Sequence, residues 1–423
     1  NKRLKHVGNR MNNGITLIAL VITIIVLLIL AGVSIATLTG ENGVLTKAND
    51  ANKKTGQASA EEQVQLEVTA SIGTDGKISI PDLNKNLKNI KGLIHEGESI
   101  ENIPIDNLPA AVVVDGNNVI IRENGTVVVS EWIQTGYKIT NEEITVKIGD
   151  YVLNYDEGTE STQIETAESG HTEQQALITE NLGWRILGIG ENGGLELISD
   201  NPTTTPVTLS GETGFLNGEE VLNTVCNKLY GKGEYAESAR SLNAQDINKL
   251  ANYAPKTYSG YGDLWKYRFS TETGYMQYSK STDKGQIWSD WRNISNTNYQ
   301  TFKVPGSTNM ISAENPIESE EIENTYYFYS IPSQISDNDI VNMITNGTGD
   351  SNITQWLASC PILCNVHCAN FYVQSISSGD VYSQHVYNSS GISRSYSKVI
   401  RPVISLNPNI KLEKFSENSW KIK

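Results

Sequence analysis

An uncharged apolar run from Ile15 to Leu38 constrains this chain more than any other feature of its sequence. At 1.5 Å per residue, a helix over this run is long enough to cross roughly 30 Å of hydrocarbon. A helix also satisfies its own backbone polar groups within lipid. Four basic residues precede the run: Lys2, Arg3, Lys5 and Arg10. By the positive-inside rule, the sequence predicts a single-pass cell-membrane protein whose C-terminal part is extracellular.

The start of this run resembles the N-terminus of type IV prepilins and pseudopilins. Gly14 closes a basic leader over residues 1–14, and Ile-Thr-Leu-Ile-Ala-Leu follows it. The resemblance implies that prepilin peptidase cuts after Gly14, that Ile15 is methylated, and that other pilin subunits pack against the helix in a surface filament. The chain departs from the family at Ala19, where the family carries a glutamate that neutralises a neighbour's terminal amine. A plain signal anchor and a cleaved secretory signal are the alternatives.

The length and net charge of the chain indicate how many domains follow the apolar run and which partners to expect. The chain is long enough for two or three further domains. Its net charge of −15 and pI near 4.9 exclude nucleic acid as an expected partner, because no basic patch or stripe stands out. We expect an α+β protein in four parts. A long N-terminal transmembrane or pilin helix with a stalk covers 15–58, and a small antiparallel pilin-like α+β domain covers 59–130. A linker with a short strand covers 131–177, and a C-terminal domain covers 178–423.

Periodicity predicts the elements of these parts. Val64, Val68 and Ile72 form a helical stripe, although Leu66 leaves a strand open as the alternative. The sequence further predicts a strand over Lys77–Ile80, a helix over Asp82–Ile90, and strands over Ala111–Val114, Asn118–Arg122 and Thr126–Val129, with Asp115-Gly116 and Asn124-Gly125 as hairpin turns. Beyond these we expect a strand over Val146–Leu153, an exposed loop over Asp156–Glu173, a hairpin over Gly183–Asp200, a helix over Gly218–Tyr230, a helix capped by Ser241 or Asn243, and long loops with short strands over Tyr258–Tyr299.

The end of the chain carries a second resemblance. A Trp-Leu-Ala-Ser segment within Thr354–Ser359 precedes the apolar segment Phe371–Val381 with its Gly turn, and an Arg-Pro-Val strand lies within Val399–Leu412. This order resembles the C-type-lectin-like fold, in the branch of formylglycine-generating-enzyme-like domains and the variable proteins of diversity-generating retroelements. The framework residues are then Trp356, in the core, and Arg401, a buried or half-buried arginine that needs a carboxylate or carbonyl partner.

Composition singles out a candidate binding face within this region. From Leu357 to Ser397 there is no Lys, Glu, Met or Trp, and every residue of Ser359–Asn370 has a codon that ends in a pyrimidine. In the retroelement family such a pattern follows from mutagenesis of adenines, which varies exposed positions on a rigid scaffold. The candidate ligand-contacting residues are Cys360, Ile362, Cys364, Asn365, His367, Cys368, Tyr382, Ser383, His385, Tyr387, Asn388, Ser393, Ser395 and Tyr396. An ordinary polar loop of biased composition is the alternative.

Two chemical alternatives use the cysteines of this segment. Cys360, Cys364 and Cys368 at a spacing of four, with His367, suggest a metal site, but zinc motifs use pairs from two segments and Cys226 is alone. A formylglycine-generating activity needs a framework cysteine pair, which this segment does not provide. We therefore expect no enzyme activity, no cofactor and no metal. The expected function is recognition of an extracellular protein or glycan by a cell-surface prepilin-type protein, with a structural minor pilin and a surface enzyme as the alternatives.

Overall fold

The computed structural model describes residues 24–25, 27, 44–251, 263–308, 310–317, 320–325, 329–331, 335, 337–345 and 354–423. The predicted cleavage and methylation residues Gly14 and Ile15, and the departure at Ala19, lie outside the described residues.

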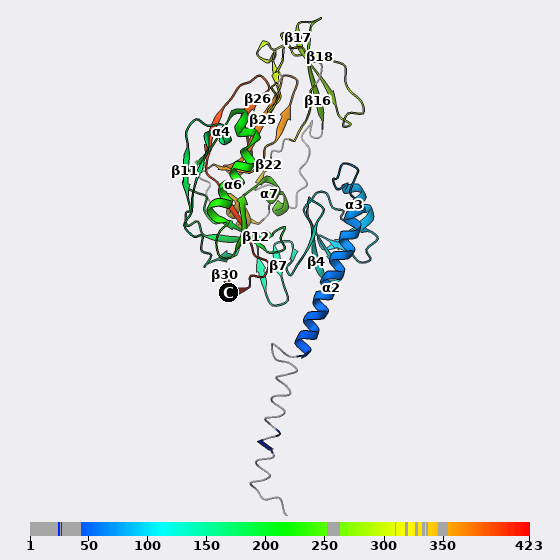
Figure 1. Cartoon of the computed structure of the whole chain (residues 1–423), viewed down its shortest axis with the longest axis vertical. Helices are drawn as coiled ribbons and strands as arrows, with labels where there is room; N and C mark the ends of the chain where they lie inside the picture. The colour runs from blue at the N-terminus through cyan, green and yellow to red at the C-terminus, as the bar shows by residue number, and fades with distance from the viewer. Residues whose placement is uncertain are drawn as a thin grey trace, which may run out of the picture.

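The N-terminal unit consists of two helices and a five-stranded antiparallel sheet (Figure 1). Its elements are α2 (Val44–Thr69), α3 (Ile80–Leu87), β1 (Ile94–His95), β2 (Glu98–Ser99), β3 (Ala110–Val114), β4 (Asn117–Ile121) and β5 (Val127–Ser130). The strands lie in the order β2-β1-β3-β4-β5. The helix α2 packs along β4 and β5, which buries Val64 and Val68 completely.

Local sequence explains most of this unit. The three predicted strands are confirmed, and Asp115 and Gly116 form the turn between β3 and β4 with φ angles of 49° and 78°. The stripe residues Val64 and Val68 lie on a helix, but Ile72 lies beyond its end and is 43% exposed. Instead of the predicted strand before α3, Ser79 caps that helix by accepting a hydrogen bond from the Asp82 backbone N–H at 3.4 Å.

The largest sheet has seven strands in the order β15-β28-β13-β12-β9-β30-β29. These strands are β9 (Tyr151–Val152), β12 (Trp184–Ile189), β13 (Leu195–Ser199), β15 (Ala236–Ser241), β28 (Pro402–Leu406), β29 (Leu412–Ser416) and β30 (Ser419–Ile422). The predicted hairpin over Gly183–Asp200 is confirmed as β12 and β13. The final strand β30 pairs in parallel with β9, so the C-terminus of the chain closes on a strand far earlier in the sequence.

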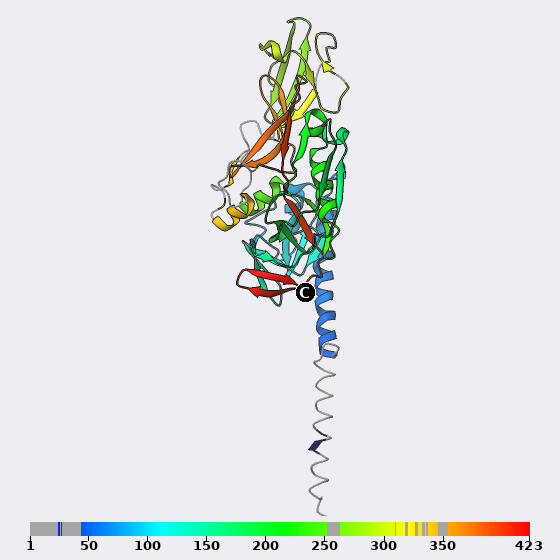
Figure 2. The same ribbon diagram turned by 90° about the vertical axis from the view of Figure 1, so that its left-hand side faces the viewer.

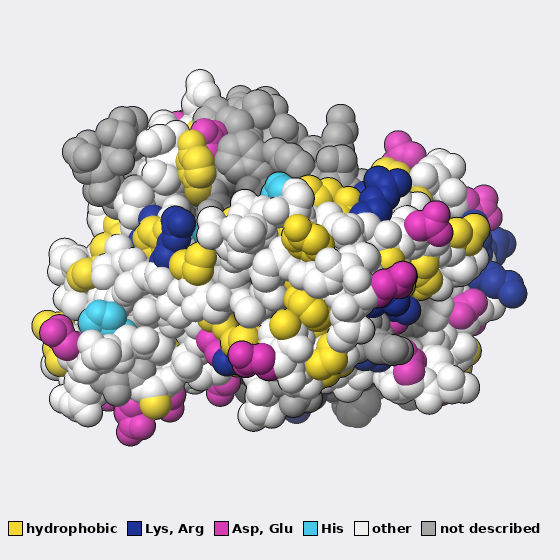
Figure 3. Space-filling view, turned by 90° about the horizontal axis from the view of Figure 1, so that it is seen from above, with side chains coloured by type: hydrophobic (Ala, Val, Ile, Leu, Met, Phe, Trp, Pro, Cys, Tyr) yellow, Lys and Arg dark blue, Asp and Glu magenta, His cyan; other side chains and the backbone are white. Residues whose placement is uncertain are grey.

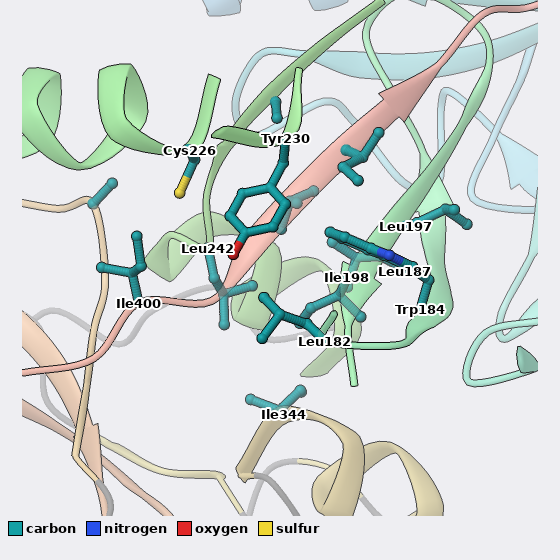
Figure 4. Packing of buried hydrophobic residues seen from close by; sticks show 14 of the residues in the cluster. Leu182, Trp184, Leu187, Leu197, Ile198, Cys226, Tyr230, Leu242, Ile344 and Ile400 are labelled. Atoms are coloured by element: carbon teal, nitrogen blue, oxygen red, sulfur yellow. The ribbon is translucent and has the colours of Figure 1, made fainter. Parts of the chain in front are cut away.

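Helices surround this sheet and enclose the main core. They are α4 (Thr166–Ser169), α5 (Gly211–Leu216), α6 (Gly218–Tyr230), α7 (Ala244–Ala251) and α9 (Asn338–Thr345). The Trp184 ring lies 5.1 Å from the Tyr155 ring and 5.9 Å from the Tyr230 ring, between centroids (Figure 4). Of the two predicted caps for α7, Asn243 is the one that accepts from Asp246, at 2.9 Å.

The segment expected to be a linker forms two further small sheets. One contains β6 (Ile133–Thr135), β7 (Lys138–Thr140) and β8 (Thr145–Lys147), and the other contains β10 (Ser161–Ile164) and β11 (Gln175–Ile178). The predicted strand over Val146–Leu153 is divided into β8 and β9, because Gly149 turns the chain between them with φ +95°. The predicted loop over Asp156–Glu173 contains β10 and α4.

A four-stranded sheet, here called the tip sheet, lies at the end of the molecule away from the start of α2 (Figures 1 and 2). Its order is β18-β17-β16-β21, and its strands are β16 (Leu264–Ser270), β17 (Tyr275–Ser281), β18 (Arg292–Asn293) and β21 (Glu320–Glu323). The short elements η1 (Thr297–Tyr299), β19 (Phe302–Lys303) and β20 (Met310–Ile311) follow β18. Where the sequence predicted loops and short strands, β16 and β17 are thus both seven residues long.

The remaining strands carry the candidate site. They form a sheet of order β22-β26-β25-β23, in which β24 also pairs with β25, and a separate pair of β14 with β27. The strands are β14 (Val207–Ser210), β22 (Tyr329–Ser330), β23 (Gln355–Trp356), β24 (Ile362–Cys364), β25 (Ala369–Ser377), β26 (Asp380–Asn388) and β27 (Ser395–Lys398).

The structure corrects the predicted fold class. In the part of the chain that the structure describes, the protein is mostly β-sheet with few helices (21% helical) rather than α+β, because segments without clear periodicity pair as strands across long sequence separations. Within the described residues, no helix is both long and apolar enough to cross a bilayer. This finding contradicts the predicted transmembrane or pilin helix and the predicted single-pass membrane localisation. The apolar run itself lies outside the described residues, except for Ile24, Ile25 and Leu27.

Candidate ligand-binding face

The candidate contact residues lie on a long hairpin and its neighbours. The strands β25 and β26 pair around a turn at Ser378 and Gly379, whose φ angles are 52° and 81°, with one register shift between Phe371 and Tyr372. Both positive angles suit the two-residue turn that matches strand twist. The hairpin therefore provides a rigid two-stranded support for the side chains on either face.

The structure separates the predicted contact residues by burial. Four of them are exposed: His367, Tyr382, Ser393 and Ser395. Six are partly buried: Cys360, Ile362, Asn365, Ser383, His385 and Tyr396. Four are buried: Cys364, Cys368, Tyr387 and Asn388. One continuous surface therefore does not contain all of them.

The buried members pack against the tip sheet. Cys364, Phe371 and Tyr387 share a hydrophobic cluster with Tyr267 of β16 and with Phe302. The Tyr267 and Phe302 rings stack with their centroids 4.1 Å apart. Since successive residues of a strand point to opposite faces, one face of β24 and β25 supports the tip and cannot also contact a ligand.

The turn that carries Cys364 and Cys368 is organised by an asparagine. Asn365 Oδ1 accepts the backbone N–H groups of His367 at 2.8 Å and Cys368 at 3.1 Å. Burial raises the pKa of the thiols of Cys360 and Cys364 to about 12 and that of Cys368 to about 11. The thiols therefore stay protonated near neutral pH, a state that favours neither nucleophilic attack nor metal binding.

The cysteines form neither disulfides nor a metal cluster in the part of the chain that the structure describes. All four are free thiols. No group of three or more His, Cys, Asp or Glu side chains in the described ranges is arranged to hold a metal ion.

The other face of the hairpin presents polar and aromatic groups side by side. Tyr372 lies opposite His385 and Gln374 lies opposite Ser383, so these four residues share one face, here called the 383/385 face. The Tyr372 and His385 rings are 5.6 Å apart between centroids. Ser383 Oγ and His385 Nε2 are covered atoms without a hydrogen-bond partner among the described residues, although both residues are partly exposed.

The electrostatics of this face keep the histidine neutral. Burial lowers the pKa of His385, and the positive charge of Arg394 lowers it further. A neutral imidazole has one nitrogen that donates and one that accepts a hydrogen bond. The imidazole and the Ser383 hydroxyl can thus each donate and accept a hydrogen bond, and the exposed guanidinium of Arg394 adds further donors.

Sequence reasoning did not select Tyr372 or Arg394 for this face. The turn Ser378-Gly379 predicts the hairpin register, and that register places Tyr372 beside His385. Arg394 follows β26 and its backbone N–H donates to Val386 at 2.8 Å, which brings it back toward the hairpin. Strand register is therefore a sequence signal that could have identified Tyr372 as part of this face.

The two framework residues lie in the core. Trp356 is fully buried, and its indole N–H donates to the Val207 carbonyl at 2.8 Å. Arg401 is also fully buried, and its guanidinium donates to the carbonyls of Met343 at 2.8 Å, Ile344 at 3.2 Å and Ser199. The partners of this arginine are therefore carbonyls rather than a carboxylate.

Comparisons with known proteins add no relative: no protein-family model, no curated protein and no solved structure matches the chain. The function therefore has to be argued from the site alone.

Proposed function

We propose that this protein is a ligand-recognition protein without catalytic activity, and that the 383/385 face contacts its ligand. The observation that carries the proposal is that Ser383 Oγ and His385 Nε2, on one face of a hairpin and in partly exposed residues, both lack a hydrogen-bond partner among the described residues. Most covered polar atoms in proteins have a partner, and the exceptions call for an explanation such as a ligand.

The chemistry of the face suits recognition. Tyrosine, serine, histidine and arginine combine flat aromatic area with adaptable hydrogen bonding, as in antibody paratopes. Ser383 and His385 are only partly buried, so side-chain rotation on a fast timescale can turn both unpartnered atoms outward. The hairpin backbone stays fixed meanwhile, which limits the entropy lost on binding.

The thiols give no support to the enzymatic alternative. Cys360, Cys364 and Cys368 are protonated near neutral pH. Cys364 lies in a packed cluster, Cys360 lies against one and Cys368 is buried, and none of them is on the 383/385 face. A catalytic thiol needs the opposite setting, with a lowered pKa and access to the substrate. The recognition proposal predicts that changing any one of them to serine alters no chemical step.

A binding screen followed by substitution tests the proposal. A glycan array and a displayed peptide library are screened with the full chain, and the affinity for each hit is measured by calorimetry. His385→Ala and Ser383→Ala should each weaken binding at least tenfold, whereas Thr271→Ala, an exposed position on the tip sheet, should leave it unchanged. Hits that bind all three variants like the parent chain would place recognition elsewhere.

The variability of this face is tested separately. The codons for Trp356 to Leu406 are sequenced across many cells of one lineage. Substitutions clustered at adenine-derived positions, with Trp356 and the β28 residues unchanged, would support a diversified binding face. A uniform sequence would remove the argument for variability while leaving the 383/385 face as the proposed contact.

A further inference from the structure

The tip sheet has one face that packs inward and one that does not. Trp265 and Tyr267 of β16 belong to the cluster that includes Cys364 and Phe371. Lys266 and Arg268 alternate with them and therefore lie on the opposite face of the sheet. This outer face is turned away from β24 and β25, so it is separate from the 383/385 face.

Two tryptophans cover the two cations of the outer face. The Nζ atom of Lys266 lies 4.0 Å from the centre of the Trp288 ring, and the Cζ atom of Arg268 lies 4.2 Å from the centre of the Trp291 ring. The two cations are two residues apart on one strand, so their Cα atoms lie roughly 7 Å apart along β16. Lys266, Arg268, Trp288 and Trp291, with the neighbouring Gln277 and Asn293, are here called the tryptophan platform.

The segment that holds the rings is tied to the sheet by hydrogen bonds. Ser289 donates its N–H to the Lys280 carbonyl at 2.9 Å, and Ser289 Oγ accepts the Lys280 N–H at 3.0 Å. Asp283 Oδ1 accepts the N–H of Ile287 at 2.8 Å. The rings are therefore held in position before any ligand arrives, and binding to them orders few additional groups.

The charge of the platform is not balanced within the described residues. Lys266 pairs with Glu321 at 2.7 Å. Arg268 donates its Nε–H to the neutral Gln277 Oε1 at 2.9 Å, and across the residues that the structure places, no carboxylate forms an ion pair with Arg268. The outer face thus carries a guanidinium without a carboxylate partner among the described residues, on a chain of net charge −15. Seen from above, basic and hydrophobic side chains lie side by side on this end of the molecule (Figure 3).

We infer that the tryptophan platform binds an acidic glycan, a chain of sugars that carry carboxylates or sulfates. The C–H face of a sugar ring is apolar and slightly positive, and it stacks on the electron-rich face of an indole. Guanidiniums bind carboxylate and sulfate groups through paired N–H donors. The exposed Asn293 amide, whose Oδ1 accepts a hydrogen bond of 2.8 Å from the buried Gln277, suits a sugar hydroxyl on the same face.

An acidic protein segment fits this face less well. A protein interface has a packed apolar centre, with aliphatic and aromatic side chains from both partners. Apart from its two indoles, the platform consists of charged and amide groups, and among the described residues Leu264 on the same face and Ile287, 74% exposed, are the aliphatic side chains near the Trp288 ring. The alternation of flat rings with single cations along one strand favours a linear chain of rings.

Titration of the full chain with defined polymers tests this inference. Polygalacturonate carries carboxylates, dextran sulfate carries sulfates, dextran is neutral, and poly-glutamate is an acidic peptide. We expect binding to polygalacturonate or dextran sulfate that weakens with added salt, and no binding to dextran. Trp288→Ala, Trp291→Ala and Arg268→Gln should each reduce the affinity at least tenfold, while Trp291→Phe should retain most of it.

The control is a matched pair at another end of the molecule. Phe415 is 58% exposed, and the Nζ atom of Lys421 lies 4.2 Å from the centre of its ring, so Phe415→Ala removes a comparable exposed aromatic without touching the platform. Circular dichroism and thermal melting establish that each variant is folded. Absence of binding to both acidic polysaccharides, equal binding by the tryptophan variants and the parent chain, or stronger binding to poly-glutamate would each overturn the inference.

Discussion

At the scale of single residues, the structure separates buried polar groups that are satisfied from those that are not. Arg401 and Trp356 have carbonyl partners, and they belong to the framework. Among the described residues, Ser383 Oγ and His385 Nε2 have none, and they lie on the candidate face. Arg401 Nε also lacks a partner there, so a missing partner alone does not mark a binding group; Ser383 and His385 differ from Arg401 in being partly exposed, which leaves their atoms within reach of a ligand.

Replacing Arg401 should destabilise the protein strongly. The change Arg401→Met replaces the guanidinium with an unbranched apolar side chain that fills much of the same space. The carbonyls of Met343, Ile344 and Ser199 then lose their hydrogen-bond donor. Because several buried acceptors lose a partner at once, we expect a loss of about 3–5 kcal/mol in the free energy of unfolding. Urea denaturation measures the change, and exposed Arg394→Met should stay within about 0.5 kcal/mol of the parent chain. An equally small effect at Arg401 would refute the framework role.

His385 should make stability depend on pH. Its pKa in the folded protein lies below the ordinary value of 6.5 because of burial and Arg394. The unfolded chain therefore binds more protons between the two pKa values, so the stabilising term present above pH 6.5 is lost as the pH falls toward the folded pKa. Urea denaturation at pH 7.5 and 5.5 measures the free energy of unfolding. Its decrease between the two pH values should be smaller for His385→Asn than for the parent chain. An equal decrease in both proteins would assign the pH dependence to other groups.

At the scale of elements, tight turns decide the hairpins of this molecule. The turns after β3 and β25 both place a non-glycine residue and then a glycine at positive φ: Asp115 with Gly116, and Ser378 with Gly379. Asp-Gly is a strong sequence signal for this geometry, and it predicts the first hairpin. The register that the second turn imposes creates the 383/385 face.

The first turn provides a direct test of this view. No atom lies within 4 Å of a Cβ placed on Gly116, so Gly116→Ala introduces backbone strain without a clash. We expect a loss of about 1–2 kcal/mol, since a side chain disfavours the left-handed region. Thermal or urea unfolding measures it. Asp115→Asn is the control, because asparagine tolerates positive φ, and an equal loss in both variants would contradict the explanation.

At the scale of the whole molecule, separate hydrophobic cores underlie the architecture. The N-terminal unit has its own core, which runs from Ala60 to Val127 and includes Val64, Val68 and Leu83. The main core begins at Trp132 and extends to Ile422. Polar contacts connect the two parts, such as the hydrogen bond of 2.6 Å from Ser130 Oγ to the Gly193 carbonyl.

A fragment over residues 44–132 should therefore fold alone. It contains α2, α3, the five-stranded sheet and the Trp132 carbonyl that accepts from Asn118 Nδ2 at 2.7 Å. A domain with its own core unfolds cooperatively. Dispersed amide signals and a single sigmoidal urea transition are the expected results. A collapsed spectrum without dispersion would show that the main body is needed to hold this unit.

Local features of this protein follow from signals between residues close along the chain. Dipeptide turns and period-two patterns predicted β3, β4, β5 and the β12–β13 hairpin, and one apolar stripe predicted α6. Other features depend on long-range packing. The pairing of β30 with β9, the strands of the expected linker, and the burial of Cys364 and Tyr387 under the tip sheet all depend on contacts between distant segments. Local periodicity carries no information about such partners. The predicted α+β class was therefore wrong, and only part of the predicted binding face is exposed to solvent.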